Sequence, residues 1–274
     1  MKKTCVSRVD RKVTAGTREW ADHNINCIIG CLNNCRYCYA KMMARRFRRD
    51  TYENWSVMRI RKEVVERTFS KMVGRVMFPS SHDIVDVPDI REACLNTLGK
   101  LLESNNEVLV TTKPRFSIIK QIDKLYSGYK KNLQFRFTIT STDNSLLKFW
   151  EPNAPLFEER LESLKYVFDR KYRTSVSIEP YLDRKPQLLV SMVEPFCTES
   201  IWIGKMNYIP SDSKLSRDLQ PFYSKVRRNY EIDHLLQIYN DLSNLQKIKF
   251  KDSVMIKLSN NGLIKSNLAI SVPL

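Results

Sequence analysis

Three cysteines near the start of the chain, Cys31, Cys35 and Cys38, are spaced C-x3-C-x2-C. The chain has seven cysteines and no recognisable signal peptide, so a cysteine cluster indicates metal binding or catalysis rather than a disulfide framework. A metal held by only three protein ligands keeps an open coordination position, which is typical of reactive sites. The spacing therefore predicts a metal centre that can bind a further ligand.

Two kinds of metal centre fit this pattern. A structural zinc site needs four ligands, so His23 or Cys27 would have to complete it. A [4Fe–4S] cluster normally takes four thiolates, and with three of them one iron stays open. Cys27 lies in the apolar run just upstream, and the strand register decides whether its side chain faces the cluster.

The composition indicates a globular protein of 274 residues with 42% hydrophobic content. No apolar run approaches the roughly 18 to 20 residues that span a bilayer, and the basic start of the chain leads into no apolar segment. We therefore expect a cytoplasmic monomer with no membrane association. Cys94 and Cys197 are isolated, and we interpret them as small core residues.

The formal net charge of +16 favours a polyanionic partner, either nucleic acid or an acidic protein surface, although a lysine bias can also serve solubility alone. The densest basic stretch is interleaved with the aromatic residues Phe47, Tyr52 and Trp55. Such a pattern suits stacking on single strands or extruded bases, and it equally suits an amphipathic helix with a solvated face. The basic residues of this stretch are Arg45, Arg46, Arg48, Arg49, Arg59, Arg61 and Lys62.

Strand and helix patterns alternate through at least six units, which predicts an α/β fold with a parallel sheet. We predict strands at 26–30, 75–81, 107–114, 133–142, 174–180, 200–207 and 253–258. We predict helices at 40–47, 88–104, 116–126, 154–170, 186–196 and 232–245. This order favours a partial (β/α)6 TIM-like barrel, with an open doubly wound sheet as the alternative. We expect an N-terminal extension at 1–24, the barrel at 25–208, and a C-terminal helix and strand extension at 209–274 packed on the barrel.

Polar residues gather where the predicted strands end. Because chemistry in parallel barrels lies at the carboxyl ends of the strands, we expect these residues to converge on one face. They are the cysteine loop, Ser80–Asp83, Thr112–Lys113, Thr140–Thr142, Glu179 and Lys205–Asn207. The basic segment 209–230 would cover the open side of the barrel, contact the substrate, or form a surface loop.

The cysteine loop, GCLNNCRYCY at 30–39, resembles the signature of the radical S-adenosylmethionine (SAM) superfamily, whose pattern is C-x3-C-x-aromatic-C after the first strand of a partial (β/α)6 barrel. The resemblance implies that three thiolates hold a [4Fe–4S] cluster whose open iron chelates SAM. Reductive cleavage of SAM would then give a 5′-deoxyadenosyl radical that abstracts hydrogen from a substrate. It also implies an acidic electron donor such as a flavodoxin or ferredoxin.

Several stretches resemble the spore photoproduct lyase-like group, whose founding member repairs a thymine lesion in DNA. They include the loop with a tyrosine on each side of Cys38, the segment 80–85, Lys113, and the stretches 151–155, 177–180 and 203–204. In that lyase, a cysteine in the segment matching 80–85 returns a hydrogen atom to the product radical, and this chain has Ser80 there. A serine O–H bond is too strong for that step, so we expect a relative with a different substrate step rather than a true spore photoproduct lyase.

The resemblance also implies roles for single residues, each with a plainer structural alternative. Tyr37 and Tyr39 would flank the cluster and the adenine, or simply pack. Ser81 and Lys113 would reach the methionyl part of SAM. Thr140 and Ser141 would contact its ribose or carboxylate, or cap strand ends. Glu179 would face SAM or substrate, or form a buried salt bridge. Ser80 and His82 are the candidate catalytic residues.

Three functions follow from these observations. The first is a radical SAM enzyme that acts on nucleic acid or a nucleotide-containing substrate. The second is a radical SAM enzyme for a peptide or small metabolite, with its basic face docking the electron donor. The third is a zinc-stabilised, non-catalytic nucleic-acid-binding protein.

Overall fold

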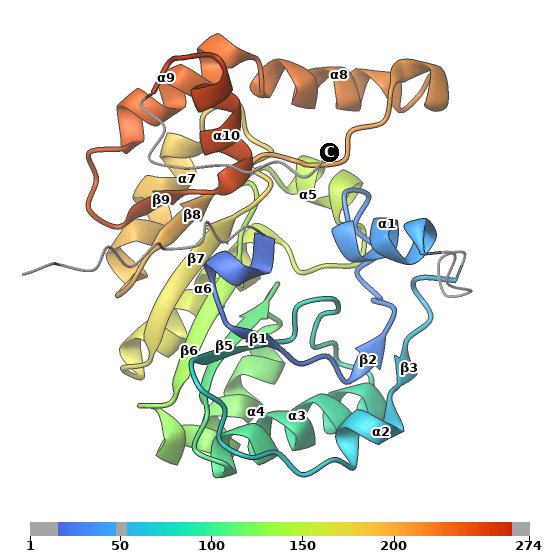
Figure 1. The fold of residues 1–274 in the computed structure, drawn as a ribbon, viewed down its shortest axis with the longest axis vertical. Helices are drawn as coiled ribbons and strands as arrows, with labels where there is room; N and C mark the ends of the chain where they lie inside the picture. Colours follow the sequence, from blue (N-terminus) through green and yellow to red (C-terminus); the bar gives the residue numbers. More distant parts are fainter. Residues whose placement is uncertain (1–15, 48–53, 265–274) are drawn as a thin grey trace, which may run out of the picture.

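The computed structural model describes residues 16–47 and 54–264. Their largest feature is a seven-stranded, wholly parallel sheet with the strand order β1-β4-β5-β6-β7-β8-β9 (Figure 1). The strands are β1 (His23–Asn24), β4 (Arg75–Phe78), β5 (Glu107–Thr112), β6 (Leu133–Thr138), β7 (Arg173–Ile178), β8 (Ile201–Ile203) and β9 (Ile248–Phe250). The order in the sheet follows the order in the chain with no reversal, as in a half-barrel and unlike a doubly wound sheet. The predicted partial TIM-like barrel is confirmed.

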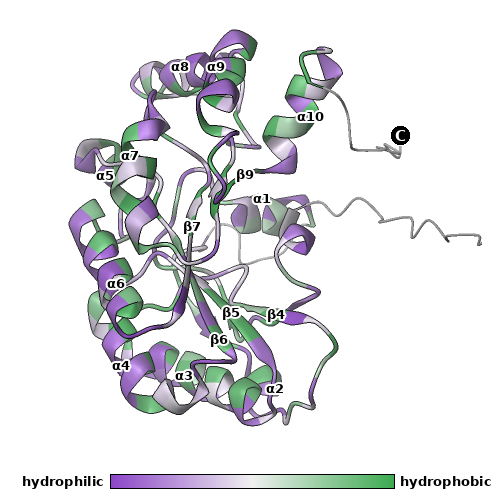
Figure 2. Cartoon of the chain, turned by 90° about the vertical axis from the view of Figure 1, so that its left-hand side faces the viewer, coloured by the Kyte–Doolittle hydropathy of each residue, from purple (hydrophilic) through white to green (hydrophobic). Residues whose placement is uncertain are grey.

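Helices connect the strands and cover the outer face of the sheet, with α4 to α7 ranged along one side of it in Figure 2. The connecting helices are α3 (Pro88–Glu103), α4 (Phe116–Tyr126), α5 (Asn144–Trp150), α6 (Phe157–Asp169), α7 (Pro186–Val193), α8 (Gln220–Asn229) and α9 (Ile232–Leu242). Short 3-10 turns occupy Gly16–Glu19, Ser127–Tyr129, Glu194–Phe196 and Asp212–Lys214. None of the helices within 16–47 and 54–264 is long and apolar enough to cross a membrane.

The central strands are apolar because both of their faces are covered. Val108, Val110, Phe135 and Phe137 are fully or almost fully buried, and Val110 of β5 lies opposite Phe135 of β6. Such continuous burial is typical of strands in a parallel sheet. Cys94 and Cys197 are buried in the same core, as predicted from the sequence.

The first predicted strand is not part of the main sheet. Ile28–Ile29 forms β2, which pairs antiparallel with β3 (Arg59–Ile60), and the first strand of the sheet is His23–Asn24. Where the chain leaves the sheet, the side-chain oxygen of Asn26 accepts a hydrogen bond from the amide of Ser80 at 2.7 Å. The apolar run was therefore read correctly as a strand but was assigned to the wrong sheet.

The last predicted strand, at 253–258, is wrong. These residues lie in helix α10 (Asp252–Asn260), and the last strand is β9. The buried residues Val254 and Leu258 are four positions apart, which is a helical spacing. Because β9 pairs with β8, the segment predicted as a C-terminal extension supplies an edge strand of the sheet. The domain limits themselves stay a prediction.

The sequence patterns did not indicate helices α2 (Lys62–Val65), α5 and α8, and the structure now decides the conformation of segment 209–230. Helix α5 begins at Asp143, whose carboxylate accepts hydrogen bonds from the amides of Ser145 and Leu146 at 2.8 and 3.3 Å. The short helix α2 follows β3. The segment 209–230 is no irregular loop, because it contains the 3-10 turn at Asp212–Lys214 and the whole of helix α8.

Candidate functional site

The cysteine loop leads from β2 into helix α1 (Tyr39–Arg46) and is held by backbone contacts. Gly30 has a φ of +86°, and a Cβ atom there would lie 2.5 Å from the carbonyl oxygen of Val57, so glycine is required. The amide of Cys31 donates to the carbonyl of Trp55 at 2.7 Å. Cys38 caps α1, because its sulfur accepts from the amide of Lys41 at 3.4 Å.

The three signature cysteines line one cavity of about 360 Å³ at the carboxyl ends of the strands. Residues from the loops after β4 to β8 also line it, so the expected convergence is observed. The lining includes Ser80, Ser81, His82, Asp83, Thr112, Lys113, Thr138, Glu179, Lys205 and Lys251. Tyr37 and Tyr39 complete the wall beside the cysteines.

The thiols of this cavity suit a cationic ligand. Burial raises the pKa of Cys31 to about 12, and the nearby Asp83 carboxylate and Cys38 add to this. Burial likewise raises the pKa of Cys35 and of Cys38 above the ordinary thiol range. A bound metal or metal cluster would reverse the effect, since its positive charge stabilises thiolates. The three donors are soft sulfur atoms, so the residues fit an iron–sulfur cluster or another thiophilic metal.

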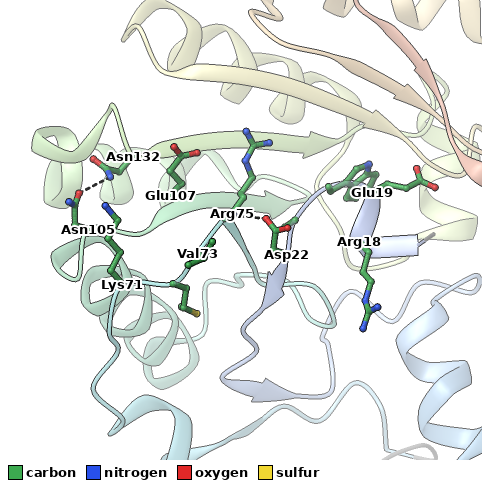
Figure 3. Close-up of a pocket in the computed structure, with 13 residues that line it drawn as sticks. Arg18, Glu19, Asp22, Lys71, Val73, Arg75, Asn105, Glu107 and Asn132 are labelled. Atoms are coloured by element: carbon green, nitrogen blue, oxygen red, sulfur yellow. Dashed lines mark hydrogen bonds between the residues drawn. The ribbon is translucent and has the colours of Figure 1, made fainter. Parts of the chain in front are cut away.

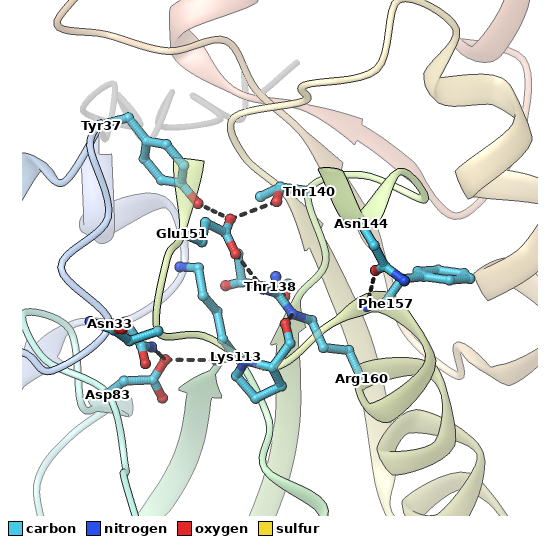
Figure 4. A network of polar contacts seen from close by, with 12 residues as sticks. Asn33, Tyr37, Asp83, Lys113, Thr138, Thr140, Asn144, Glu151, Phe157 and Arg160 are labelled. Carbon is cyan, nitrogen blue, oxygen red and sulfur yellow. Dashed lines mark hydrogen bonds and ion pairs between the residues drawn. The ribbon is translucent and has the colours of Figure 1, made fainter. Parts of the chain in front are cut away.

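Glu151 is the centre of a buried polar network behind the cysteines (Figure 4). It accepts hydrogen bonds from the hydroxyl of Tyr37, from Thr140 at 2.6 Å and from the guanidinium of Arg160. Burial alone would raise the pKa of the Glu151 carboxyl, but Arg160 and Lys113, with these hydrogen bonds, hold it below its usual range. Glu151 is therefore a fixed negative charge that anchors Tyr37 of the signature loop.

Asp83 ties the cysteine loop to the sheet. Its carboxylate accepts from the side chain of Asn33 at 2.7 Å, from the amide of Lys113 at 3.0 Å and from the hydroxyl of Thr112. Arg115 donates to the other side of Asn33 at 2.7 Å. Figure 4 shows the Lys113 side chain between Asp83 and Glu151. Burial lowers the pKa of Lys113, but Cys35, Glu151 and Asp83 outweigh it and leave the pKa above the ordinary lysine value.

Ser80, Ser81 and His82 lie together on the loop after β4. The side chain of Asn26 binds the amides of Ser80 and Ser81 at 2.7 and 2.9 Å, and Tyr39 donates its hydroxyl proton to the carbonyl of Ser80. His82 is buried, and its Nδ1 lies 3.2 Å from the carbonyl oxygen of Asp83. All three residues line the cavity, while their catalytic and binding roles stay predictions.

Thr140 and Ser141 are the two predicted cofactor contacts that do not line the cavity. Both are fully buried, and their hydroxyls bind the carboxylates of Glu151 and Asp183. In this geometry they hold other side chains in place. Thr138, the last residue of β6, lines the cavity instead.

Cys27 and His23 lie away from the three signature thiols. The ring of His23 contacts the carbonyl of Val73 at 2.9 Å, and neither residue lines the cavity. The sulfur of Cys27 lies 3.8 Å from that of Cys94. The hydrogen bond with Cys94 lowers the pKa of Cys27 to about 5 against the effect of burial, and His82 and Thr97 contribute. The arrangement offers no fourth ligand from these two residues to the signature cysteines.

The basic stretch with interleaved aromatic residues is divided in the structure. Trp55 is buried against Cys31 and α1, so it is not a stacking platform. Phe47 is 58% exposed at the end of α1. Arg48, Arg49 and Tyr52 lie outside the described residues. The stretch therefore keeps an exposed basic end beside the cavity without the predicted set of three aromatic side chains.

Sequence reasoning missed an ionic group on the far wall of the cavity. Lys251, only 2% exposed, lies 3.0 Å from the carboxylate of Glu19 and donates to the carbonyl of Gly16 at 2.8 Å. Gly204 lets Glu179 approach, because a Cβ atom there would lie 2.8 Å from Cγ of Glu179 and 3.0 Å from Cγ of Lys251. No sequence signal indicated Lys251, since it follows an edge strand that was not predicted.

The ionisation of Glu179 makes a first prediction. Burial raises the pKa of Glu179 to about 7; the charge of Lys251 opposes this, and Glu19 and Asp252 reinforce it. Between pH 4.5 and 7, the folded protein therefore holds a proton on Glu179 that the unfolded chain has released. This bound proton stabilises the folded state at low pH, and the stabilisation is lost as the pH rises through 7. Between pH 5 and pH 8, we expect the wild type to lose about 2 to 3 kcal/mol of unfolding free energy relative to Glu179→Gln, measured by urea unfolding.

Glu162→Gln, at an exposed position on α6, is the control and should show no such change relative to the wild type. A difference between wild type and Glu179→Gln that is the same at both pH values would contradict the assigned ionisation.

A larger cavity, of about 790 Å³, lies at the opposite end of the sheet, at the amino ends of the strands (Figure 3). Arg75 and Glu107, the first residues of β4 and β5, line it, together with Arg18 and Lys71. Asp22 accepts a hydrogen bond from the amide of Arg75 at 2.8 Å. Its walls contain none of the signature cysteines, and parallel barrels carry chemistry at the opposite end. The smaller cavity is therefore the candidate site.

Comparisons with known proteins support the fold. No family model matches the chain. An uncharacterized protein of Methanocaldococcus jannaschii is 23% identical over 163 residues, covering 59% of this chain and 61% of that protein. An uncharacterized protein of Acidianus two-tailed virus is 24% identical over 172 residues, covering 59% of this chain and 55% of that protein. The match thus spans less than two thirds of these curated relatives.

Solved structures of spore photoproduct lyase have the same fold. A mutant of that lyase superposes with a TM-score of 0.51 at 14% identity, covering 89% of this chain and 79% of the lyase chain. A second mutant, with dinucleoside spore photoproduct, gives a TM-score of 0.50 at 15% identity, covering 81% of this chain and 64% of that chain. The resemblance to the spore photoproduct lyase-like group is therefore confirmed for the fold alone.

Proposed function

We propose that this chain is a radical SAM enzyme in which Cys31, Cys35 and Cys38 hold a [4Fe–4S] cluster. The observation that carries the proposal is the convergence of three buried thiols of this spacing on a cavity at the carboxyl ends of a parallel half-barrel. When bound, the cluster would supply the electron that cleaves SAM to methionine and a 5′-deoxyadenosyl radical.

The residues around the cavity have separate tasks in this proposal. Lys113 offers a positive charge beside Cys35 and is suited to bind the carboxylate of the methionyl group. Tyr37 is held by Glu151 and lines the cavity wall beside the cysteines. Glu179 supplies a titratable carboxylate on the opposite side of the cavity, toward SAM or substrate.

For the substrate class we propose nucleic acid or a nucleotide-containing molecule. The net charge of +16 and the lining residues Lys113 and Lys205 favour an anion. Tyr39 and Tyr208 line the cavity and are each 43% exposed, so they offer aromatic faces for a base. This class agrees with the dinucleoside ligand of one similar lyase structure. Ser80 stands where that lyase group has a hydrogen-donating cysteine, so the product radical is quenched differently here.

The electron donor we propose is an acidic protein such as a flavodoxin or ferredoxin. Arg45 and Arg46 are exposed on α1, the helix that begins directly after Cys38. A basic surface next to the cluster ligands suits docking of an acidic partner at a short distance for electron transfer.

The test of the enzyme class is electron paramagnetic resonance on anaerobically reconstituted, dithionite-reduced protein. We expect a [4Fe–4S]⁺ signal that changes when SAM is added. Cys35→Ala should lose the signal, and Cys197→Ala, at an equally buried core position, should keep it. Zinc in place of iron, or a cluster signal that does not respond to SAM, would exclude the radical SAM function and favour a zinc-stabilised nucleic-acid-binding protein.

The substrate class is tested separately by the affinity for DNA and RNA oligonucleotides at several salt concentrations. Phosphate contacts predict a linear fall of log K with log salt concentration. Weak binding without that slope would favour a peptide or small metabolite as the substrate instead.

A further inference from the structure

A second group of sulfur and nitrogen donors lies outside the signature loop. Cys27 precedes β2, His82 follows β4, and Cys94 lies in the first half of α3. Their ligand atoms all lie within 4.8 Å of one another, and all three residues are buried. The tertiary structure alone brings them together, since His82 is 55 residues from Cys27 in the sequence.

The distances in this group fit a single metal ion. The two sulfur atoms are 3.8 Å apart, which is too far for a disulfide bond of about 2.05 Å. Two thiolates bound tetrahedrally to one Zn²⁺, with Zn–S bonds of about 2.3 Å, are about 3.8 Å apart. The thiol pair therefore already has the separation that a mononuclear thiolate site needs.

His82 supplies the observation that points to a ligand. Its Nδ1 faces the carbonyl oxygen of Asp83 at 3.2 Å, and a carbonyl oxygen only accepts, so Nδ1 carries the proton. The lone pair of a neutral ring is then on Nε2, which is buried and makes no hydrogen bond of ordinary geometry, and the ring lies close enough to Cys27 to lower the pKa of that thiol. An imidazole held by an Nδ1–H to carbonyl bond with its Nε2 open is the usual arrangement of a metal-binding histidine.

We propose that Cys27, His82 and Cys94 form a second metal site, for a thiophilic ion of the Zn²⁺ class. Two thiolates and one imidazole are the protein donors of known three-ligand Zn²⁺ sites, in which water takes the fourth position. The two thiols lie apart from the signature cysteines, because Cys27 and Cys94 pack in the main core while Cys31 packs with Trp55 and α1. His82 lies on the wall of the signature cavity and is the point where the two groups adjoin. An ion there would join the β2 region, the loop after β4 and α3.

Cobalt binding tests the site without any use of the proposed catalytic activity. The probe is Co²⁺, titrated anaerobically into the full chain carrying Cys31→Ala, Cys35→Ala and Cys38→Ala, so that the signature site is absent. We expect one equivalent to bind, with a thiolate-to-cobalt charge-transfer band and the d–d bands of tetrahedral Co²⁺. Adding Cys94→Ala should weaken binding by at least about 100-fold, whereas adding Cys197→Ala should leave it unchanged.

A second measurement covers the case in which the triple variant does not fold. In the otherwise wild-type chain, elemental analysis should show that Cys94→Ala loses one equivalent of zinc while its iron content matches that of Cys197→Ala. Absence of the bands, equal binding in both cysteine variants, or two thiols fewer than expected in a thiol titration of the unfolded chain would overturn the proposal. The zinc result is independent of the result with SAM, so failure of either proposal is distinguishable from failure of the other.

Discussion

Glu151→Ala is expected to lower the free energy of unfolding by about 3 to 5 kcal/mol, because it leaves a buried arginine without its counter-charge. The side chains of Glu151 and Arg160 are both completely buried. The remaining donors of Arg160 bind only neutral carbonyls, those of Pro155 at 2.8 Å and Thr138 at 3.2 Å. The variant would also free the hydroxyl of Tyr37 in the signature loop.

Urea unfolding of the cofactor-free protein measures this effect. Glu158→Gln is the matched control, because Glu158 is exposed and its carboxylate binds only Asn144, so its loss should cost less than about 1 kcal/mol. If Glu151→Ala does not fold, Glu151→Gln keeps the shape and still removes the charge. The double variant Glu151→Gln with Arg160→Met removes both charges and should recover most of the loss. A single variant as stable as the control would contradict the network.

Asp83→Ala is expected to cost about 3 kcal/mol and to release the cysteine loop. The buried carboxylate accepts four hydrogen bonds, from the amides of Ile84 and Lys113 and the side chains of Asn33 and Thr112. Removing it leaves these donors unsatisfied in the protein interior, and each such group is costly. Because Asn33 lies between Cys31 and Cys35, we also expect reduced iron binding on reconstitution.

Two measurements separate the effect of Asp83 on stability from its effect on the position of the cysteine loop. Thermal or urea unfolding gives the loss of stability, and iron content after reconstitution gives the loss of cluster binding in the fraction that folds. Asp86→Asn is the control, because that carboxylate is 44% exposed and pairs with Arg91 on the surface. Iron binding equal to wild type in Asp83→Ala would show that the loop does not depend on this carboxylate.

The amino-acid sequence by itself determined the fold class and grouped the three cysteines that we propose as cluster ligands. The continuous apolar run at 107–112 and the helical pattern at 157–169 are strong because these segments pack in the core, where burial dictates residue type. The C-x3-C-x2-C spacing is local in the chain, so no tertiary information was needed to group Cys31, Cys35 and Cys38.

Only the tertiary structure decided which polar groups meet. The pairs Asp83 with Asn33 and Glu151 with Tyr37 are 50 and 114 residues apart. The β2 ribbon and the edge strand β9 are short, so pairing rather than local pattern defines them. Thr140 and Ser141 do not line the cavity, and their hydroxyls donate hydrogen bonds to the carboxylates of Glu151 and Asp183. Such contacts depend on chain segments that only folding brings together, and local patterns carry no information about them.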